Sequence, residues 1–162
     1  MMGQQLVPAE FAVPETLFSA DFILRPLTIH HLVKDYDAVM SSAERLRGVL
    51  GPQTDWPPED LTLEQDLVDL GWHQREFQMR RSFAYTVLSP DESRCLGCLY
   101  IYPSENSSYD AMVVMWVRDG EFRNNLDEAL FSTVKQWLRD HWPFSCVAFP
   151  GRDTPWSDCN SF

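Results

Sequence analysis

The pattern of hydrophobic and polar positions is most regular in residues 109–149, where it predicts a strand, a helix and a second strand. The first strand, Ala111–Val117, contains no charged residue, which is typical of a strand covered on both faces. The helix extends from Leu126 to about His141 and ends before a proline. Its apolar face comprises Leu126, Ala129, Leu130, Thr133, Val134, Trp137 and Leu138. Residues 145–149 form the second strand, and the pattern predicts that both strands are parallel neighbours.

Two further helices are predicted in the first half of the chain. Apolar side chains recur at helical spacing between residues 32 and 50, and Gly51 follows them as a helix terminator. A second apolar stripe extends from residue 63 to residue 77. Thr62 and Gln65 have the spacing of a capping box at its start, in which each side chain accepts a hydrogen bond from the backbone N–H of the other residue.

Short apolar segments predict three more strands around these helices. Residues 22–27 form the first, and residues 82–88 and 94–102 form a hairpin joined by a turn at residues 89–93. The predicted order of elements is therefore β-α-α-β-β-β-α-β. This order indicates an α/β (α+β) fold with a mixed central sheet flanked by helices.

The chain is predicted to be one domain that comprises residues 1–162. Residues 22–149 form its core, residues 1–20 form an N-terminal arm over the surface, and residues 150–162 form a C-terminal tail. A domain of this length buries about two thirds of its unfolded surface, and a hydrophobic content of 44% supplies the core. No segment approaches the roughly 20 apolar residues of a membrane span. The N-terminus lacks the pattern of a signal peptide, so we expect a cytoplasmic protein without membrane contacts.

The net charge of −11 restricts the class of ligand. Nucleic acid is excluded as a partner, because phosphate binding needs clustered Lys and Arg side chains. The same charge attracts a cationic substrate at long range. The six tryptophans are either core residues or the walls of an aromatic pocket for a flat or cationic ligand.

Two of the four cysteines, Cys95 and Cys98, have Cys-x-x-Cys spacing. A structural zinc site usually adds a second such pair, and Cys146 and Cys159 lie too far apart to supply it. Residues three apart on a regular strand point to opposite faces, which suits neither a disulfide nor shared metal ligation. We therefore expect packed, reduced thiols and no metal, with redox or metal chemistry as the alternative.

The element order, together with strings at residues 22–28, 83–88, 96–103 and 112–118, resembles the GNAT N-acetyltransferase superfamily. The resemblance covers about residues 22–149. It implies an acyltransferase that moves an acetyl group from acetyl-CoA to a small amine or similar acceptor. In that family the fourth strand lends backbone groups to the pantetheine arm, and the following turn and helix N-terminus hold the pyrophosphate.

The resemblance implies where acetyl-CoA would lie on this chain. Its pantetheine arm would follow Trp116, Val117 and Arg118, and its phosphates would lie near the turn before the helix. The residues of that turn are Arg123, Asn124 and Asn125.

The phosphate loop departs from the family pattern, which has the form Gln/Arg-x-x-Gly-x-Gly/Ala. Arg123 matches the first position, but Leu126 and Glu128 stand where glycine or alanine is expected. Asn125 and Glu128 instead have the spacing of a capping box. Asp127 and Glu128 would also meet a bound pyrophosphate as like charges. The alternative is therefore a self-capped helix that binds no phosphate.

The candidate general base is Asp110, because it opens the strand that precedes the helix. Glu105 and Glu121 are the other nearby carboxylates, and a solvated turn residue is the alternative for all three. The histidines are interpreted as surface, packing or helix-end residues.

The expected edge of the sheet is apolar, because residues 145–149 carry no charge. The family usually continues with another helix and two strands, whereas residues 151–162 are too few for them. We expect that a second copy of the chain covers this edge in a homodimer, through the edge itself or by exchange of the N-terminal arm. The alternatives are that the chain's own arm covers the edge, or that the tail folds back with Trp156 and Phe162 as anchors. The functional alternative to an enzyme is an inactive GNAT-like ligand-binding or oligomerisation module.

Overall fold

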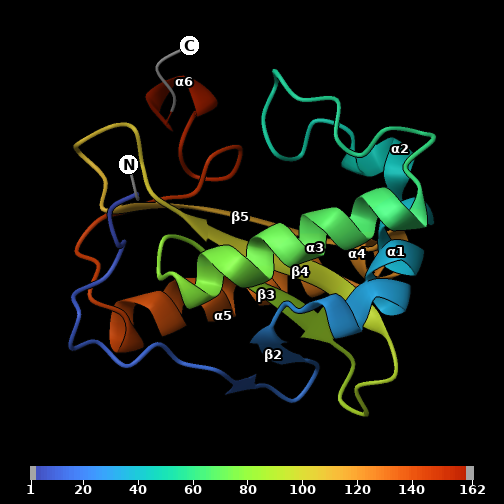
Figure 1. Cartoon of the computed structure of the whole chain (residues 1–162), viewed down its shortest axis with the longest axis horizontal. Helices are drawn as coiled ribbons and strands as arrows, with labels where there is room; N and C mark the ends of the chain where they lie inside the picture. Colours follow the sequence, from blue (N-terminus) through green and yellow to red (C-terminus); the bar gives the residue numbers. More distant parts are fainter. Residues whose placement is uncertain (1–2, 160–162) are drawn as a thin grey trace.

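Six strands form one mixed sheet with helices on both faces (Figure 1). The computed structural model describes residues 3–159. The strands cross the sheet in chain order: β1 Leu17–Phe18, β2 Ile23–Pro26, β3 Phe83–Leu88, β4 Cys95–Tyr102, β5 Ala111–Val117 and β6 Val147–Ala148. The helices are the 3-10 helix η1 Ile29–His31 and the α-helices α1 Leu32–Met40, α2 Ala43–Leu46, α3 Leu63–Gln78, α4 Asp119–Arg123, α5 Leu126–His141 and α6 Trp156–Cys159. None of the helices in the described part of the chain is long and apolar enough to cross a membrane.

The β5-α5-β6 unit confirms the predicted strand-helix-strand pattern. β5 and β6 are parallel, with Ala111 opposite Val147 and Met112 opposite Ala148. The other neighbouring strands are antiparallel. α5 is unbroken, and its buried residues are Leu126, Leu130, Val134, Trp137 and Leu138. The mixed fold class predicted from the sequence is therefore confirmed.

Each face of the sheet has its own hydrophobic core. The first core lies between the sheet and α5 and contains Met115 and Trp137. The second lies between the sheet and α1–α3 and contains Leu70 and Trp116. Successive residues of β5 enter opposite cores, which explains why this strand carries no polar side chain.

The prediction of one helix over residues 32–50 is wrong. α1 ends at Met40, and Ser41 and Ser42 separate it from α2. Ser42 is buried, and its Oγ accepts a hydrogen bond from the backbone N–H of Asp119 at 2.9 Å. Ser41 Oγ accepts one from Arg118 Nη2 at 3.3 Å. The two serines thus bind the segment after β5, and this tertiary contact outweighs the helical periodicity.

The second helix begins at the predicted capping box. Thr62 Oγ1 accepts a hydrogen bond from the backbone N–H of Gln65 at 3.1 Å, and Gln65 Oε1 accepts one from the backbone N–H of Thr62 at 2.9 Å. These bonds satisfy two of the backbone donors that a helix start leaves free.

The predicted arm and tail both pack against the core. In the arm, Val7 is buried in the first core, and Pro14 accepts a hydrogen bond from the Tyr85 hydroxyl at 2.5 Å. In the tail, Trp156 packs against the second core, and the backbone carbonyl of Asp158 accepts a hydrogen bond from Asn106 Nδ2 at 2.6 Å. The tail therefore folds back as far as residue 159, while the second expected anchor, Phe162, lies outside the described residues.

A β-bulge in β4 overturns the expectation that Cys95 and Cys98 point to opposite faces. Cys95 lies opposite Leu88, whereas Gly97 lies opposite Val87, so β4 contains one extra residue in between. The extra residue reverses the alternation of side chains. Cys95 and Cys98 consequently both enter the second core. The structure has all four cysteines as free thiols.

Candidate functional site

The strands β5 and β6 separate soon after they pair, and this leaves one side of β5 open. Their register ends at Met112 and Ala148, although β5 continues to Val117. The carbonyl oxygens of Met115 and Val117 face the opening, because they accept hydrogen bonds from Arg152 Nη2, at 3.1 Å, and from Arg45 Nη2. The N–H and C=O groups of one strand residue point to the same side. The open stretch of β5 therefore offers backbone donors as well as acceptors.

A cavity of about 320 Å³ lies in this opening. β5, the segment after α2, α4, the start of α5 and the turn after β6 all contribute to its wall. The lining residues are Arg45, Gly48, Val49, Val114, Met115, Trp116, Phe122, Asp127, Pro150, Gly151, Arg152 and Trp156.

Two arginines dominate the polar part of this cavity. Arg152 forms a bidentate ion pair with Asp127, with both N···O distances at 2.8 Å. Arg45 pairs with Asp119 at 2.5 Å and lies 4.5 Å above the ring of Phe122. Asp127 is thus neutralised by Arg152, so the expected repulsion between this carboxylate and a bound phosphate is reduced.

The structure brings only part of the predicted cofactor site together. Trp116 lines the cavity, and the Val117 carbonyl faces the opening. Arg118 instead turns toward α1, where it pairs with Asp37 at 3.0 Å and donates to the Cys95 carbonyl at 3.1 Å. The other three residues of the prediction lie exposed at the junction of α4 and α5: Arg123, Asn124 and Asn125.

The predicted capping box at Asn125 does not form. Asn125 has a left-handed backbone, with φ of 63°, and makes no side-chain cap hydrogen bond. The short helix α4 ends just before this residue. Asparagine is one of the few residues other than glycine that tolerate a left-handed backbone. A helix followed by a left-handed residue thus replaces the glycine-rich loop of the family pattern.

Asp110, the predicted base, lies at the closed end of the β5/β6 pair. Its Oδ2 accepts hydrogen bonds from the backbone N–H groups of Ser145, at 2.6 Å, and Cys146, at 2.9 Å. Its own N–H donates to the Cys146 carbonyl at 2.7 Å. Asp110 therefore holds the two strands together, and its catalytic role stays a prediction.

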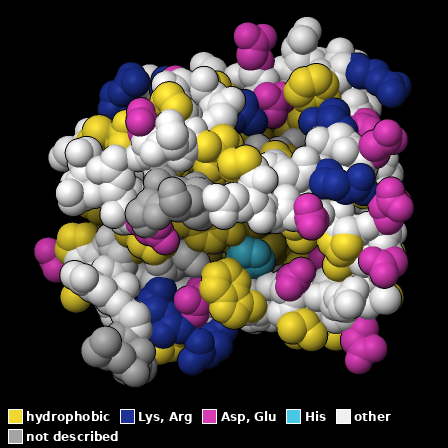
Figure 2. Space-filling view, turned by 90° about the horizontal axis from the view of Figure 1, so that it is seen from above, with side chains coloured by type: hydrophobic (Ala, Val, Ile, Leu, Met, Phe, Trp, Pro, Cys, Tyr) yellow, Lys and Arg dark blue, Asp and Glu magenta, His cyan; other side chains and the backbone are white. Residues whose placement is uncertain are grey.

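A second cavity, of about 230 Å³, lies on the α1–α3 side of the sheet and combines carboxyl groups with aromatic rings. We call it the acid–aromatic cavity. Its acidic residues are Asp35, Asp66 and Asp69, and its aromatic residues are Trp56, Trp72, His73, Tyr100 and Tyr102. In the view from above, one histidine side chain lies in a hollow bordered by hydrophobic and acidic side chains (Figure 2).

Burial shifts the titration of the groups around this cavity. It raises the pKa of Asp66 to about 8, with a further contribution from the charge of Asp35. Burial also raises the pKa of Asp35 to about 7 and that of Asp69 above its ordinary value. It lowers the pKa of His73 to about 4, so the imidazole is neutral at physiological pH.

Two of these buried groups have an atom without a hydrogen-bond partner among residues 3–159. They are Asp66 Oδ2 and His73 Nδ1. Asp66 is only 2% exposed, which makes an unpaired oxygen costly. Such atoms in the wall of a cavity indicate a polar or charged occupant.

The two cavities share a wall. Val49 lines the cavity beside β5, and the next residue, Leu50, lines the acid–aromatic cavity. Trp116 belongs to the first wall, and its ring contacts that of Trp56 in the second, with centroids 6.1 Å apart. Trp116 Nε1 also donates to the hydroxyl of Tyr100 at 3.1 Å. A ligand bound along β5 and a ligand bound among the carboxyl groups would therefore be separated by one partition of aromatic side chains.

Solved structures match this architecture, although no protein-family model and no curated protein match the sequence. A protein assigned to the GNAT acetyltransferase family from Bordetella pertussis is 14% identical over 78% of this chain and 73% of its own, with a TM-score of 0.56. RimL, a ribosomal L7/L12 α-N-protein acetyltransferase in complex with coenzyme A, is 16% identical over 77% and 68%, with a TM-score of 0.61. The chain has the GNAT fold.

Other neighbours with this GNAT fold include a ribosomal-protein-S5-alanine acetyltransferase from Vibrio fischeri. It is 12% identical over 76% of this chain and 66% of its own, with a TM-score of 0.59. The three matches thus span about two thirds to three quarters of the neighbours' lengths. At this level of identity the likeness establishes the fold, and activity has to be argued from the site.

Sequence reasoning missed several residues of this site, and one signal could have found two of them. Asp35 and Asp66 interrupt the apolar stripes of α1 and α3 at positions that face the core. A carboxylate on a buried stripe is rare unless it has a function or a partner. Arg45 and Arg152 carried no such local signal, because they lie 72 and 37 residues from the β5 carbonyls that they bind.

Proposed function

We propose that this chain is a GNAT-like N-acetyltransferase that uses acetyl-CoA and a small cationic amine. The observation that carries the proposal is the open stretch of β5 beside a cavity that Arg45 and Arg152 line. RimL, with the same fold, is solved in complex with coenzyme A, which supports acetyl-CoA as co-substrate here. Neighbours that acetylate ribosomal proteins leave the acceptor class open, and the acid–aromatic cavity supports a small amine.

The donor would lie along the open side of β5. Backbone groups of Met115 and Val117 face that side and suit the amides of a pantetheine arm. Arg45 and Arg152 line the same cavity and supply positive charge for phosphate oxygens. Binding would require these arginines to release the β5 carbonyls. Contacts of phosphates with Arg123, Asn124 and Asn125 remain part of the proposal.

The acceptor amine would occupy the acid–aromatic cavity. Asp69 and ionised Asp66 would attract its ammonium group, and the indole ring of Trp56 would pack against it. Asp66 is the proposed base because its Oδ2 is buried in the cavity wall without a partner among residues 3–159. Its pKa of about 8 means that it acts as a base only in the ionised fraction, so turnover should rise with pH toward 8. The net charge of −11 favours the approach of a cation.

The proposed chemistry requires that the amine reach the thioester past the rings of Trp56 and Trp116, which lie between the two cavities. Asp66 takes a proton from the ammonium group, and the free amine nitrogen then forms a bond to the thioester carbonyl carbon. A backbone N–H on the open side of β5 stabilises the negative charge that develops on the carbonyl oxygen. The C–S bond breaks, the acetyl group stays on nitrogen, and the amine loses its second proton as the coenzyme A thiolate gains one.

A second function, a binding module without catalysis, is favoured by one specific observation. The β5 carbonyls that a pantetheine arm would approach are already bound by Arg45 and Arg152. α4 also stands where the family has a glycine-rich loop. A module of this kind would bind a cation in the acid–aromatic cavity and transfer nothing.

The two functions are distinguished by measuring binding and turnover together. Acetyl-CoA at one hundred times its dissociation constant should add about 2.7 kcal/mol to the free energy of unfolding, which a thermal shift detects. Release of the coenzyme A thiol in the presence of a panel of small amines reports turnover. No stabilisation at millimolar acetyl-CoA and no turnover would overturn the enzyme proposal and leave the binding module.

The variant Asp66→Asn tests the assigned base. It should lower kcat/KM about 100-fold or more, the usual contribution of a positioned base. Asp60→Asn is the matched control, because Asp60 is exposed and does not line the acid–aromatic cavity. Equal losses in both variants would show that Asp66 acts only through bulk charge.

A further inference from the structure

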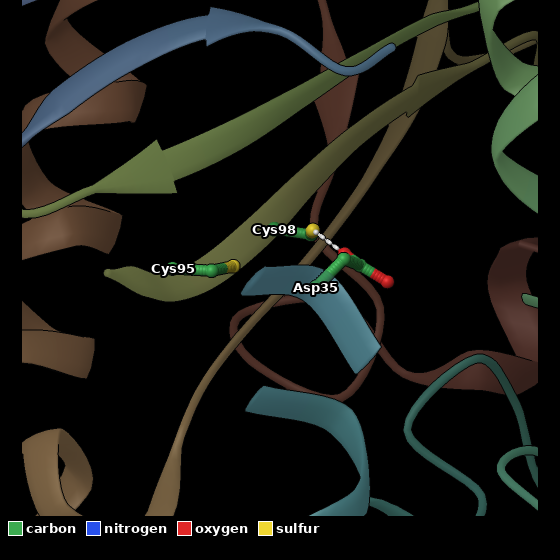
Figure 3. Close-up of side chains that lie close together, drawn as sticks. All are labelled: Asp35, Cys95 and Cys98. Carbon is green, nitrogen blue, oxygen red and sulfur yellow. Dashed lines mark hydrogen bonds between the residues drawn. The ribbon is translucent and has the colours of Figure 1, made fainter. Parts of the chain in front are cut away.

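Three potential metal ligands gather in the second core, where α1 crosses the bulged end of β4. They are Asp35 from α1 and Cys95 and Cys98 from β4 (Figure 3). One ligand atom of each lies within 4.8 Å of the other two. Cys98 Sγ donates a hydrogen bond to Asp35 Oδ1 at 3.3 Å. The three residues are buried, with exposed fractions of 3%, 1% and 0%.

The backbone makes this arrangement possible. The bulge between the two cysteines turns both thiols to the α1 face of β4. Gly97 lies between them, and a Cβ there would stand 2.0 Å from the carbonyl oxygen of Trp116. Glycine thus allows β5 to approach β4 closely at the point where the cysteines turn inward.

Packing alone does not account for the polarity of this cluster. Among the described residues, Asp35 has two hydrogen-bond partners, the carboxyl group of Asp66 and the thiol of Cys98, and a thiol is a weak donor. Asp66 interacts with Asp35, and its Oδ2 is buried without a partner in residues 3–159. No ion pair in this part of the chain involves either carboxyl group. Four acidic groups therefore meet in a region that contains no paired cation.

Arg118 contacts the backbone of the cysteine strand rather than its thiols. Its Nη1 donates to the Cys95 carbonyl, and its Nη2 pairs with Asp37. A divalent cation would supply the charge that the cluster lacks.

We propose that Asp35, Cys95 and Cys98 bind a zinc ion. Thiolates and carboxylates are both zinc ligands, and thiolates distinguish it from magnesium and calcium. A tetrahedral site with Zn–S bonds of about 2.3 Å places two sulfurs about 3.8 Å apart. This spacing is compatible with ligand atoms that all lie within 4.8 Å of one another. On binding, the two thiols and the carboxyl group release their protons to solvent.

Asp66 is a positioning residue in this proposal. It lies beside Asp35 and would orient the ligating carboxylate or a water at the fourth coordination position. The ion would join α1 to β4 and fix Asp35 in the wall of the acid–aromatic cavity. The three ligands lie outside the cavity beside β5, and Asp35 and Asp66 are shared with the proposed acceptor cavity. Metal binding is therefore measured without acetyl-CoA or an amine, so that its outcome does not depend on the proposed acetyl transfer.

Cobalt titration of the full chain under reducing conditions tests the site. Co²⁺ should bind at one equivalent and give the thiolate-to-cobalt charge-transfer and visible bands of a tetrahedral site, and Zn²⁺ should abolish them. Cys98→Ser should weaken binding at least about 100-fold, and Asp66→Asn about 10- to 100-fold. Cys159→Ser is the matched control, since Cys159 is also buried and free but lies outside the cluster. It should bind cobalt as the wild type does.

A second measurement keeps the test decisive if Cys98→Ser does not fold. In the wild type, Zn²⁺ should slow alkylation of Cys95 and Cys98 and leave that of Cys159 unchanged. Three results would overturn the proposal. They are absence of the cobalt bands, equal protection of all buried thiols, and a Cys95–Cys98 disulfide in protein isolated without reductant.

Discussion

Arg45 and Arg152 are the two cations inside the β5/β6 opening, and each is tied to β5 and to an acidic partner. Arg47, close to Arg45 in the chain, provides a comparison. Arg47, also beside α2, pairs with exposed Glu59 and does not line the cavity. The chain thus supplies a natural comparison between a cation in the opening and a cation next to it.

Arg45→Gln should weaken acetyl-CoA binding about tenfold or more, because a hydrogen bond to a charged group contributes about 1.5–3 kcal/mol. Arg47→Gln should change the dissociation constant less than about twofold, since an exposed pair contributes little. Isothermal titration with acetyl-CoA measures both. If the two variants lost the same affinity, only bulk charge would be involved and the opening would not be the phosphate site.

His73 should make the stability of the protein pH-dependent. Its pKa is about 4 in the folded state, lowered by burial, and about 6.5 when unfolded. Between these values the unfolded state binds more protons, so the free energy of unfolding rises with pH from about 4 to 6.5 and is lost as pH falls.

His73→Gln should remove up to about 2–3 kcal/mol of this dependence, because each pKa unit corresponds to about 1.4 kcal/mol. Urea unfolding at pH 4.5 and pH 7 measures the difference for both proteins. His141→Gln, on the last turn of α5, is the control. Identical pH profiles for His73→Gln and wild type would show that the fold does not lower the pKa of His73.

The residues of the candidate site differ in how far sequence could reveal them. Trp116 and Val117 were predicted because the family resemblance places the pantetheine arm along the strand that contains them, and their role stays a prediction. Asp66 was detectable in principle, as a carboxylate on the apolar stripe of α3. Arg45 and Arg152 could not be found from local pattern, because only the folded chain brings them to β5.

At the scale of elements, periodicity predicted each main strand and helix but not the two irregularities that shape the site. The break between α1 and α2 depends on Ser42, whose partner Asp119 lies 77 residues away. The bulge in β4 depends on Gly97 and its contact with β5. Both are tertiary effects, and a pattern confined to one segment does not contain them.

Gly97→Ala tests the packing that accompanies the bulge. The new Cβ would lie 2.0 Å from the carbonyl oxygen of Trp116, so β4 and β5 must separate. Overpacking of this kind typically costs about 1–3 kcal/mol of the free energy of unfolding. Gly120→Ala, in α4, is the control, because its Cβ would meet nothing within 4 Å. It should be neutral or stabilise by up to about 1 kcal/mol. Chemical denaturation compares them, and a neutral Gly97→Ala would contradict the assigned packing.

At the scale of the whole molecule, the order of the elements was the most predictive property of the sequence. A right-handed β-α-β crossover and a meander of hairpins leave few ways to arrange the sheet. The order of the elements does not reveal what covers the outer edge of β6, the last strand of the sheet. The segment after β6 is joined to α5, since Lys135 pairs with Asp153 at 2.8 Å.

We expect the protein to form a homodimer through the remaining β6 edge. Val147 is only partly buried and Cys146 is exposed there, and an apolar edge favours pairing with a second chain. Light scattering at micromolar concentration should give twice the chain mass of 18.8 kDa. Val147→Lys should shift the protein to monomer, because an edge lysine blocks strand pairing. Ser107→Lys, on the exposed linker before β5, should leave the mass unchanged. A wild-type mass near 18.8 kDa would contradict the dimer and leave the folded-back tail as the cover of this edge.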